Sequence, residues 1–258
     1  TDYRDVIRAL QARQVEGDAT LPLYSERLAA IEAIIRHEKI VTLPEREAII
    51  RLATAAESAS VPAPSMRPPP FVNNQGERGE FVLPLSMPSV DGTAPTRRLE
   101  DFTFDAVTWT LTAHEARPGH ELQFASMVEN GVSLARALFA FNSVNVEGWG
   151  LYAEAEMQPY LPLDGQLIAL QFRLLRAARA FLDPGLQQGT ISLDEARRVL
   201  TEEVVLTEAM TEQELQRYTF RAPGQATSYF YGYQRLLELR ARTEIALGAR
   251  FNRQRFHD

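Results

Sequence analysis

The stretch of residues 112–123 places two of the chain's four histidines, His114 and His120, on either side of the pair Pro118-Gly119. On an ideal helix, six steps of about 100° would leave two such side chains about 120° apart around the axis. They could not bind one ion from a regular helix. Pro118 cannot donate to the carbonyl of His114, and Gly119 tolerates unusual backbone angles. The pair therefore predicts that the helix opens or widens between the histidines.

Glu115 directly follows His114, so the stretch carries the residue types of a zinc hydrolase, which uses histidine ligands and a glutamate base. Without Pro118 and Gly119 the spacing would be that of the H-E-x-x-H pattern. We interpret the stretch as a zinc-binding helix with a two-residue irregularity. The alternative is a helix that stops at Arg117 and restarts after the irregularity, with two incidental histidines.

Composition restricts the chemistry that the 258-residue chain can perform. There is no cysteine, so disulfides and thiolate sites are excluded and a metal must use histidine and carboxylate ligands. A net charge of −7 without a basic block argues against nucleic acid as a partner. No apolar run approaches membrane-spanning length. Because the sequence begins at Thr1 rather than Met, we expect a piece of a longer protein, whose missing part could carry a targeting signal.

Residues 1–258 are predicted to form one mainly helical catalytic-type domain in three parts. Residues 1–60 are a helical lead-in with apolar residues at helical spacing. Residues 61–100 contain a proline-rich connector and a short strand. Residues 101–258 form the helical core that carries the metal site.

Two local predictions concern the first two parts. Pro44 with Glu45 predicts a helix start before Ile49. Residues 80–85 predict a short strand, and Pro84 marks it as an edge strand. An exposed edge just before a catalytic helix suits the binding of an extended peptide, and a simple hairpin that covers the core is the alternative.

A peptidase-type zinc site needs three protein ligands and one open position. Glu147 is predicted as the third ligand, because a carboxylate in apolar helical surroundings needs a positive partner, either zinc or an arginine. Glu154, two helical turns later, could compete as a ligand or support the site from behind. Glu115 would act as the general base towards the attacking water. Three further candidates are expected to be exposed to solvent and not to bind metal: His37, Asp105 and Glu121.

An oxyanion needs a hydrogen-bond donor in addition to the metal. Tyr229 is the leading candidate, followed by Tyr231 and Tyr233, and ordinary helix packing is the alternative for each. Anchors for a substrate carboxylate could be Arg221, Arg235 and Arg240. Surface ion pairs are the alternative role for these arginines.

Three ordered segments within residues 79–240 resemble the bacterial domain-of-unknown-function family 885, which is itself similar to the gluzincin metallopeptidases. The segments are His114-Glu115-x-x-Pro118-Gly119-His120-x-x-Gln123, then Glu147-Gly148-Trp149-Gly150-Leu151-Tyr152-Ala153-Glu154, and then Pro223-Gly224-Gln225-Ala226-x-x-Tyr229 running into Leu237-Glu238-Leu239-Arg240. Gly79-Glu80-Phe81 resembles the family's strand before the metal helix. Members are often about twice this length, so the chain resembles their C-terminal half.

The resemblance implies a multi-helical, gluzincin-like metallopeptidase fold with a small β edge or hairpin before the metal-binding helix. It implies zinc on His114, His120 and Glu147, Glu115 as the base, and Tyr229 near the reacting carbonyl. It also gives the Pro-Gly irregularity a precedent.

The chain departs from the family in one block, which usually reads Asp-x-Gly-Leu-His after an arginine-bearing helix. Here it reads Asp183-Pro184-Gly185-Leu186-Gln187, with Arg179 before it. Gln187 can donate a hydrogen bond but cannot transfer a proton, which implies slower catalysis or altered specificity. The residues expected to bind substrate or support the ligands are thus Glu154, Arg179, Gln187, Tyr231 and Arg240.

The leading hypothesis is a zinc-dependent hydrolase, a metallopeptidase that cleaves short peptides. One alternative is a metal hydrolase of an ester or a non-peptide amide. The other is a catalytically silent helical binding module with a degenerate zinc motif. The oligomeric state stays open, and so does the compartment, cytoplasmic or cell-envelope or secreted, because a missing N-terminal part would decide it.

Overall fold

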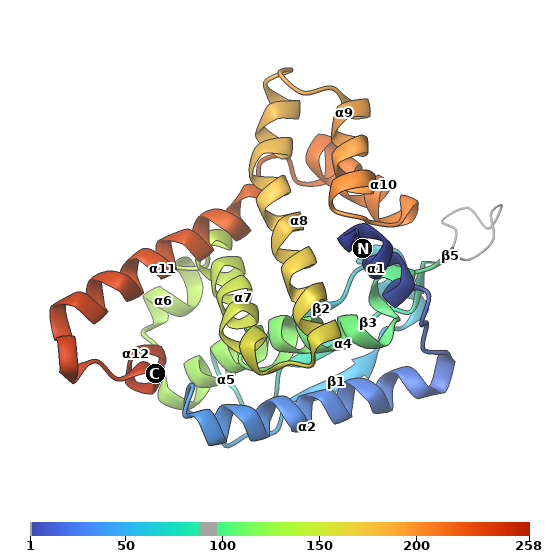
Figure 1. Ribbon diagram of the computed structural model, residues 1–258. Helices are drawn as coiled ribbons and strands as arrows, with labels where there is room; N and C mark the ends of the chain where they lie inside the picture. The colour runs from blue at the N-terminus through green and yellow to red at the C-terminus, as the bar shows by residue number, and fades with distance from the viewer. Residues whose placement is uncertain (1, 88–96) are drawn as a thin grey trace.

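The structure, a computed structural model that describes residues 2–87 and 97–258, is mainly helical with a small β part (Figure 1). The α-helices are α1 (Tyr3–Gln11), α2 (Thr20–Glu38), α3 (Ala55–Ser60), α4 (Asp105–Leu111), α5 (His120–Asn130), α6 (Leu134–Phe139), α7 (Ser143–Met157), α8 (Leu163–Gln187), α9 (Leu193–Arg198), α10 (Glu208–Gln216), α11 (Thr227–Leu247) and α12 (Arg253–His257). Segments of π-helix span Thr112–Ala116, Val199–Glu203 and Arg217–Arg221, and 3-10 turns span Gly17–Ala19, Glu100–Phe102, Gln158–Tyr160 and Gly248–Arg250. The predicted mainly α class is confirmed.

The β part lies before α4 in the chain. Strands β1 (Ile49–Leu52), β2 (Ser65–Arg67) and β3 (Glu80–Leu83) form a sheet in the order β1-β3-β2, and β4 (Ser86–Met87) pairs with β5 (Arg97–Arg98). Because β3 is parallel to β1 and antiparallel to β2, it is the central strand, and its prediction as an edge strand is wrong. Pro84 follows Leu83, the last residue paired with a neighbouring strand, so its missing N–H interrupts no ladder. The edge strands of this sheet are β1 and β2.

The helix predicted to run from Pro44 into the Ile49 region is also wrong. Ile49–Leu52 form β1, in which the β-branched Ile50 pairs with Phe81 of β3, and no helix begins at Pro44. The next helix begins only after Thr54, whose side chain and that of Glu57 form a capping box. Local periodicity could not distinguish a short apolar run in a strand from one in a helix.

Helix α4 and the segment that follows it lie in the interior. In Figure 1, α2 runs along one side of α4, and α8 crosses it on another. The main core combines Leu83 of β3, Leu111 of α4 and Leu175 of α8, all almost fully buried. The chain therefore surrounds the histidine-bearing stretch with apolar side chains, which exclude water from its inner face.

Helices α7 and α11 cross with their backbones in close contact. A Cβ atom on Gly148 would lie 2.6 Å from the backbone of Gly232, and a Cβ on Gly232 would lie 2.1 Å from the carbonyl oxygen of Val144. Only glycine permits this approach. The crossing positions Glu147 of α7 and Tyr229 of α11 near the histidine-bearing stretch. Among the described residues, no helix combines the length and apolar character needed to span a membrane.

Candidate metal centre

The two histidines converge because the helix both widens and breaks between them. His114 and Glu115 lie in the π-helical segment Thr112–Ala116, Arg117 is extended, and α5 begins at His120. The centroids of the two imidazole rings are 4.6 Å apart. The helix thus stops and restarts, as the alternative interpretation expected, yet the break is what brings the histidines together. Chain packing is tight here, because a Cβ on Gly119 would lie 1.8 Å from the carbonyl oxygen of His114.

Glu147 of α7 completes a group of three metal-binding side chains. Its Oε2 lies 3.4 Å from Nε2 of His120 and 3.6 Å from Nε2 of His114. The ligand atoms of the three residues all lie within 4.8 Å of one another. Tetrahedral ligands about 2.0–2.1 Å from a zinc ion are about 3.3–3.5 Å apart, so the spacing suits one ion. The structure therefore brings together the three predicted ligands.

Glu154 lies behind His114 and not among the candidate ligand atoms. Its Oε1 is 2.7 Å from Nδ1 of His114, and Arg176 and Thr110 donate to its carboxylate at 3.0 and 2.9 Å. Burial opposes ionisation, but Arg176 and His114 outweigh it and hold the pKa of Glu154 below its usual value. The contact fixes the orientation of the His114 ring and leaves Nε2 towards Glu147, as a partner behind a metal ligand does.

Two residues that contact His114 or its partner Glu154 were not predicted. Arg176 of α8 forms an ion pair with Glu154. In the sequence, its only distinguishing feature was its place among arginines at three-residue steps along that helix. Gly150 gives the His114 ring its space, since a Cβ there would lie 2.6 Å from Cε1 and 2.9 Å from both ring nitrogens. No sequence pattern distinguishes this glycine from its neighbour Gly148.

Glu115 is buried within the same π-helical segment as His114. Burial is the main reason that its pKa is raised above its ordinary value, although His114 and His120 act in the opposite direction. A carboxylate with a raised pKa beside the candidate ligands can accept a proton during a reaction and release it afterwards.

Tyr229 faces the site from α11. Its ring stacks on that of His114 with centroids 6.2 Å apart and an angle of 16° between the planes. Arg217, which sequence reasoning missed, donates to the phenolic oxygen at 2.9 Å. Arg179 lies over the ring at 4.7 Å and forms a double hydrogen bond with Glu214. Since the phenolic oxygen accepts from Arg217, its own proton remains available to a substrate.

Three residues expected near substrate lie elsewhere. Tyr231 is 58% exposed, because it is two residues from Tyr229 and points to another side of α11. Arg240 pairs with Glu156 and Glu244 and donates to Tyr152 at 3.0 Å. Gln187 donates to the carbonyl of Tyr218. Arg240 thus has the ion-pair role given as its alternative.

The block that contains Gln187 instead supports the start of α11. Asp183 is fully buried, and its carboxylate accepts hydrogen bonds from the backbone N–H groups of Gly224 and Ala226 at 2.8 and 3.1 Å. This carboxylate therefore ties α8 to the turn before Tyr229. Tyr233, the third tyrosine considered, is buried with Arg173 over its ring.

Of the residues expected to be exposed, His37 and Asp105 are exposed but Glu121 is fully buried. Arg117 donates to Glu121 at 2.6 Å and to Glu32 at 2.7 Å. The prediction for Glu121 is wrong because the break before α5 turns Arg117 inward as its partner. The ion pair between Arg117 and Glu121 stabilises the buried side of the helix break before α5.

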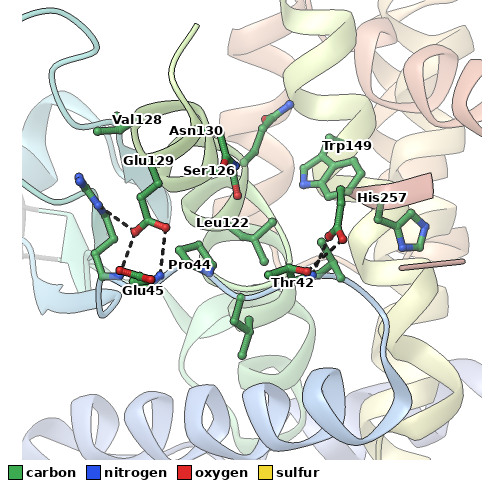
Figure 2. Close-up of a pocket in the computed structure, with 15 residues that line it drawn as sticks. Thr42, Pro44, Glu45, Leu122, Ser126, Val128, Glu129, Asn130, Trp149 and His257 are labelled. Carbon is green, nitrogen blue, oxygen red and sulfur yellow. Dashed lines mark hydrogen bonds and ion pairs between the residues drawn. The ribbon is translucent and has the colours of Figure 1, made fainter. Parts of the chain in front are cut away.

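A large cavity lies beside the candidate metal centre and does not contain it. It has a volume of about 940 Å³ and is bounded by residues 41–46, by α5 and by the C-terminal residues (Figure 2). None of the three candidate ligands lines it. Two of its three carboxylates accept hydrogen bonds, Glu129 from the backbone N–H groups of Glu45 and Arg46, and Asp258 from Thr42.

Two solved structures share this fold over nearly the whole chain, each with a TM-score of 0.80. One is a candidate lipoprotein of unknown function from Shewanella oneidensis, 23% identical over 98% of this chain and 45% of that one. The other is a candidate lipoprotein from Colwellia psychrerythraea, 24% identical over 99% of this chain and 43% of that one. The chain thus spans less than half the length of these proteins.

No curated protein shows significant similarity to the chain. The family model described as a bacterial protein of unknown function (DUF885) matches residues 1–258, and the chain belongs to that family.

Proposed function

We propose that the chain is the catalytic part of a zinc-dependent hydrolase with a gluzincin-like arrangement, and that it cleaves short peptides. The observation that carries this proposal is the convergence of His114, His120 and Glu147 within 4.8 Å, with Glu154 behind His114. Two histidines and a glutamate are the ligands of a common class of zinc peptidases. The donor set fits zinc better than magnesium or calcium, which prefer oxygen ligands alone.

The surrounding residues have the properties that hydrolysis needs. A bound zinc ion would polarise a carbonyl and lower the pKa of water. Glu115 then accepts a proton from the attacking water and delivers it to the leaving amine. Tyr229 donates its phenolic hydrogen to the developing oxyanion, while Arg217 holds the phenolic oxygen.

A peptide substrate is supported by the position of β2. Among the described strands it is at the edge of the sheet, and it contacts the π-helical segment that carries His114 and Glu115. An extended peptide that pairs with Ser65–Arg67 would pass over this segment. The edge-strand proposal for peptide binding thus moves from β3 to β2.

The test of this function combines metal content with one substitution. We expect about one zinc ion per chain by elemental analysis, and peptide hydrolysis that a chelator abolishes and zinc restores. Glu115→Gln should lower kcat by about 10²–10⁴-fold while zinc content stays unchanged, because only the proton acceptor is lost. Glu47→Gln, at an exposed loop position, is the matched control. Absence of stoichiometric zinc, or equal rates for wild type and Glu115→Gln, would refute the proposal.

Two alternative functions can be tested with the same purified protein. A parallel panel of esters and non-peptide amides distinguishes a hydrolase of another bond. A silent binding module would keep the helical fold without chelator-sensitive turnover. Gln187 gives little support to the silent binding module. Its side chain donates a hydrogen bond to the backbone carbonyl of Tyr218 and so has a structural partner.

We further propose that the chain is the C-terminal half of a longer protein in the bacterial cell envelope. Both structural relatives are candidate lipoproteins and are more than twice as long as this chain. Fractionation of the producing cells should recover the protein with the envelope, and recovery in the cytosol alone would contradict this.

A further inference from the structure

A second, smaller hollow adjoins the candidate ligands. Its volume is about 420 Å³, and α5, α6 and α7 contribute most of its wall. Phe124 of this wall stacks on the ring of His120 with centroids 6.3 Å apart and packs against Phe71 at 5.6 Å. Val146, also in the wall, directly precedes Glu147. Phe124 therefore places the hollow next to the candidate metal centre, on the side of His120.

The wall is apolar except for amides and one cation. Its apolar members include Phe71, Phe124, Met127, Val132, Phe141 and Val146. Arg136 of α6 is the one charged residue that lines the hollow. Its side chain is exposed, and none of the ion pairs of the described part of the chain involves it. In contrast, Arg235 and Arg240 of α11 are both paired with glutamates.

We propose that this hollow binds the C-terminal residue of the substrate, with a bulky apolar side chain against Phe124 and a free carboxylate against Arg136. The substrate class is then acylated amino acids and short peptides that end in an aromatic or large aliphatic residue. Hydrolysis breaks the amide bond before that residue, and water supplies the hydroxyl to the acyl carbon and hydrogen to the released amino group. The inference rests on the proposed function and names its substrate class.

Three features support this assignment physically. A guanidinium group matches a carboxylate in a two-point hydrogen bond, which a neutral terminal amide cannot replace. The apolar wall gains free energy from burying a large side chain and very little from a glycine. A hollow of this volume can hold one aromatic side chain with its terminal carboxylate.

The test compares N-benzyloxycarbonyl-glycyl-phenylalanine, its C-terminal amide and N-benzyloxycarbonyl-glycyl-glycine as substrates of the zinc-loaded protein. We expect the free acid of phenylalanine to have the lowest KM. Arg136→Gln should raise that KM about tenfold and leave the KM of the amide unchanged. Ala137→Trp, which fills the hollow, should raise the KM for phenylalanine but not for glycine. Arg235→Gln, an exposed arginine outside the hollow, is the control.

A binding measurement gives a second readout that needs no turnover. N-acetyl-phenylalanine should bind the Glu115→Gln protein about tenfold more weakly once Arg136→Gln is added, and the Arg235→Gln change should have no such effect. Hydrolysis that responds to Glu115→Gln but not to Arg136 or to the terminal carboxylate would overturn this inference alone. A wild-type protein that hydrolyses none of the three substrates and binds no zinc would overturn the proposed function with it.

Discussion

At the scale of single residues, the two nitrogens of His114 have different partners. Nε2 is directed to Glu147 and Nδ1 lies 2.7 Å from Glu154. The sequence left Glu154 open as a competing ligand or a supporting residue, because two carboxylates seven residues apart share a helix face. The position of the ring decides between them, and Gly150 allows that position by having no side chain. Such a contact between distant segments could not be predicted from the spacing.

Substitution of Glu154 tests its supporting role. Glu154→Gln should lower the affinity for zinc about 10–100-fold, because an amide no longer raises the basicity of His114 or fixes its ring. Arg176 and Thr110 can still donate to the amide oxygen, but Arg176 loses its buried counter-charge, so the variant should also lose about 3 kcal/mol of stability, and its zinc affinity is compared where circular dichroism shows it folded. Competition with a chromophoric chelator measures the affinity, and Glu47→Gln serves again as the control. Unchanged affinity would show that the contact at Nδ1 does not support the metal site.

At the scale of elements, the sequence located the histidine-bearing stretch, residues 112–123, but not its exact backbone distortion. Pro118 and Gly119 indicated the irregularity between the histidines, and α4 lies within residues 101–258, which were predicted as the helical core. A widening between the histidines was predicted, but not its form as a π-helical segment over Thr112–Ala116, because no residue within that segment marks the extra backbone length. Strand order was also missed, since the pairing of β3 with both β1 and β2 depends on contacts across loops.

At the crossing of α7 and α11, helix propensity and packing predict opposite changes in stability for the same substitution. In an isolated helix, Gly232→Ala would stabilise by about 1 kcal/mol. Here the new Cβ would lie 2.1 Å from the carbonyl oxygen of Val144 and 2.8 Å from the Cα of Gly148, so we expect a loss of about 1–3 kcal/mol in the free energy of unfolding. Zinc affinity should fall as well, because Glu147 moves with α7. Urea unfolding measures the first effect, and a more stable variant would contradict the packing argument.

At the scale of the whole molecule, a buried ion pair joins α8 to α10. Arg179 donates to both carboxylate oxygens of Glu214 at 2.7 Å, and Tyr218 donates to the same carboxylate at 2.7 Å. Figure 1 shows α9 and α10 beside the upper part of α8, on the side away from α11. The pair therefore stabilises the part of the molecule that supports Tyr229 and is distant from the sheet.

The pair also makes stability depend on pH in a defined direction. Burial opposes ionisation of Glu214, but Arg179 outweighs it and lowers the pKa of that carboxyl from 4.5 to about 2. A folded-state pKa below the unfolded value stabilises the fold above about pH 4.5, and this contribution is lost as the pH falls towards 2. Glu214→Gln removes the charge and leaves Arg179 buried without a counter-charge, which should cost about 3 kcal/mol of unfolding free energy at pH 7.

Because the stabilisation by Glu214 in the wild type is lost in acid, the difference in unfolding free energy between variant and wild type should shrink between pH 5 and pH 3. Urea unfolding at these pH values measures it, with the exposed Glu26→Gln as the control. A difference that stays constant with pH would mean that Glu214 is not the group that Arg179 holds ionised.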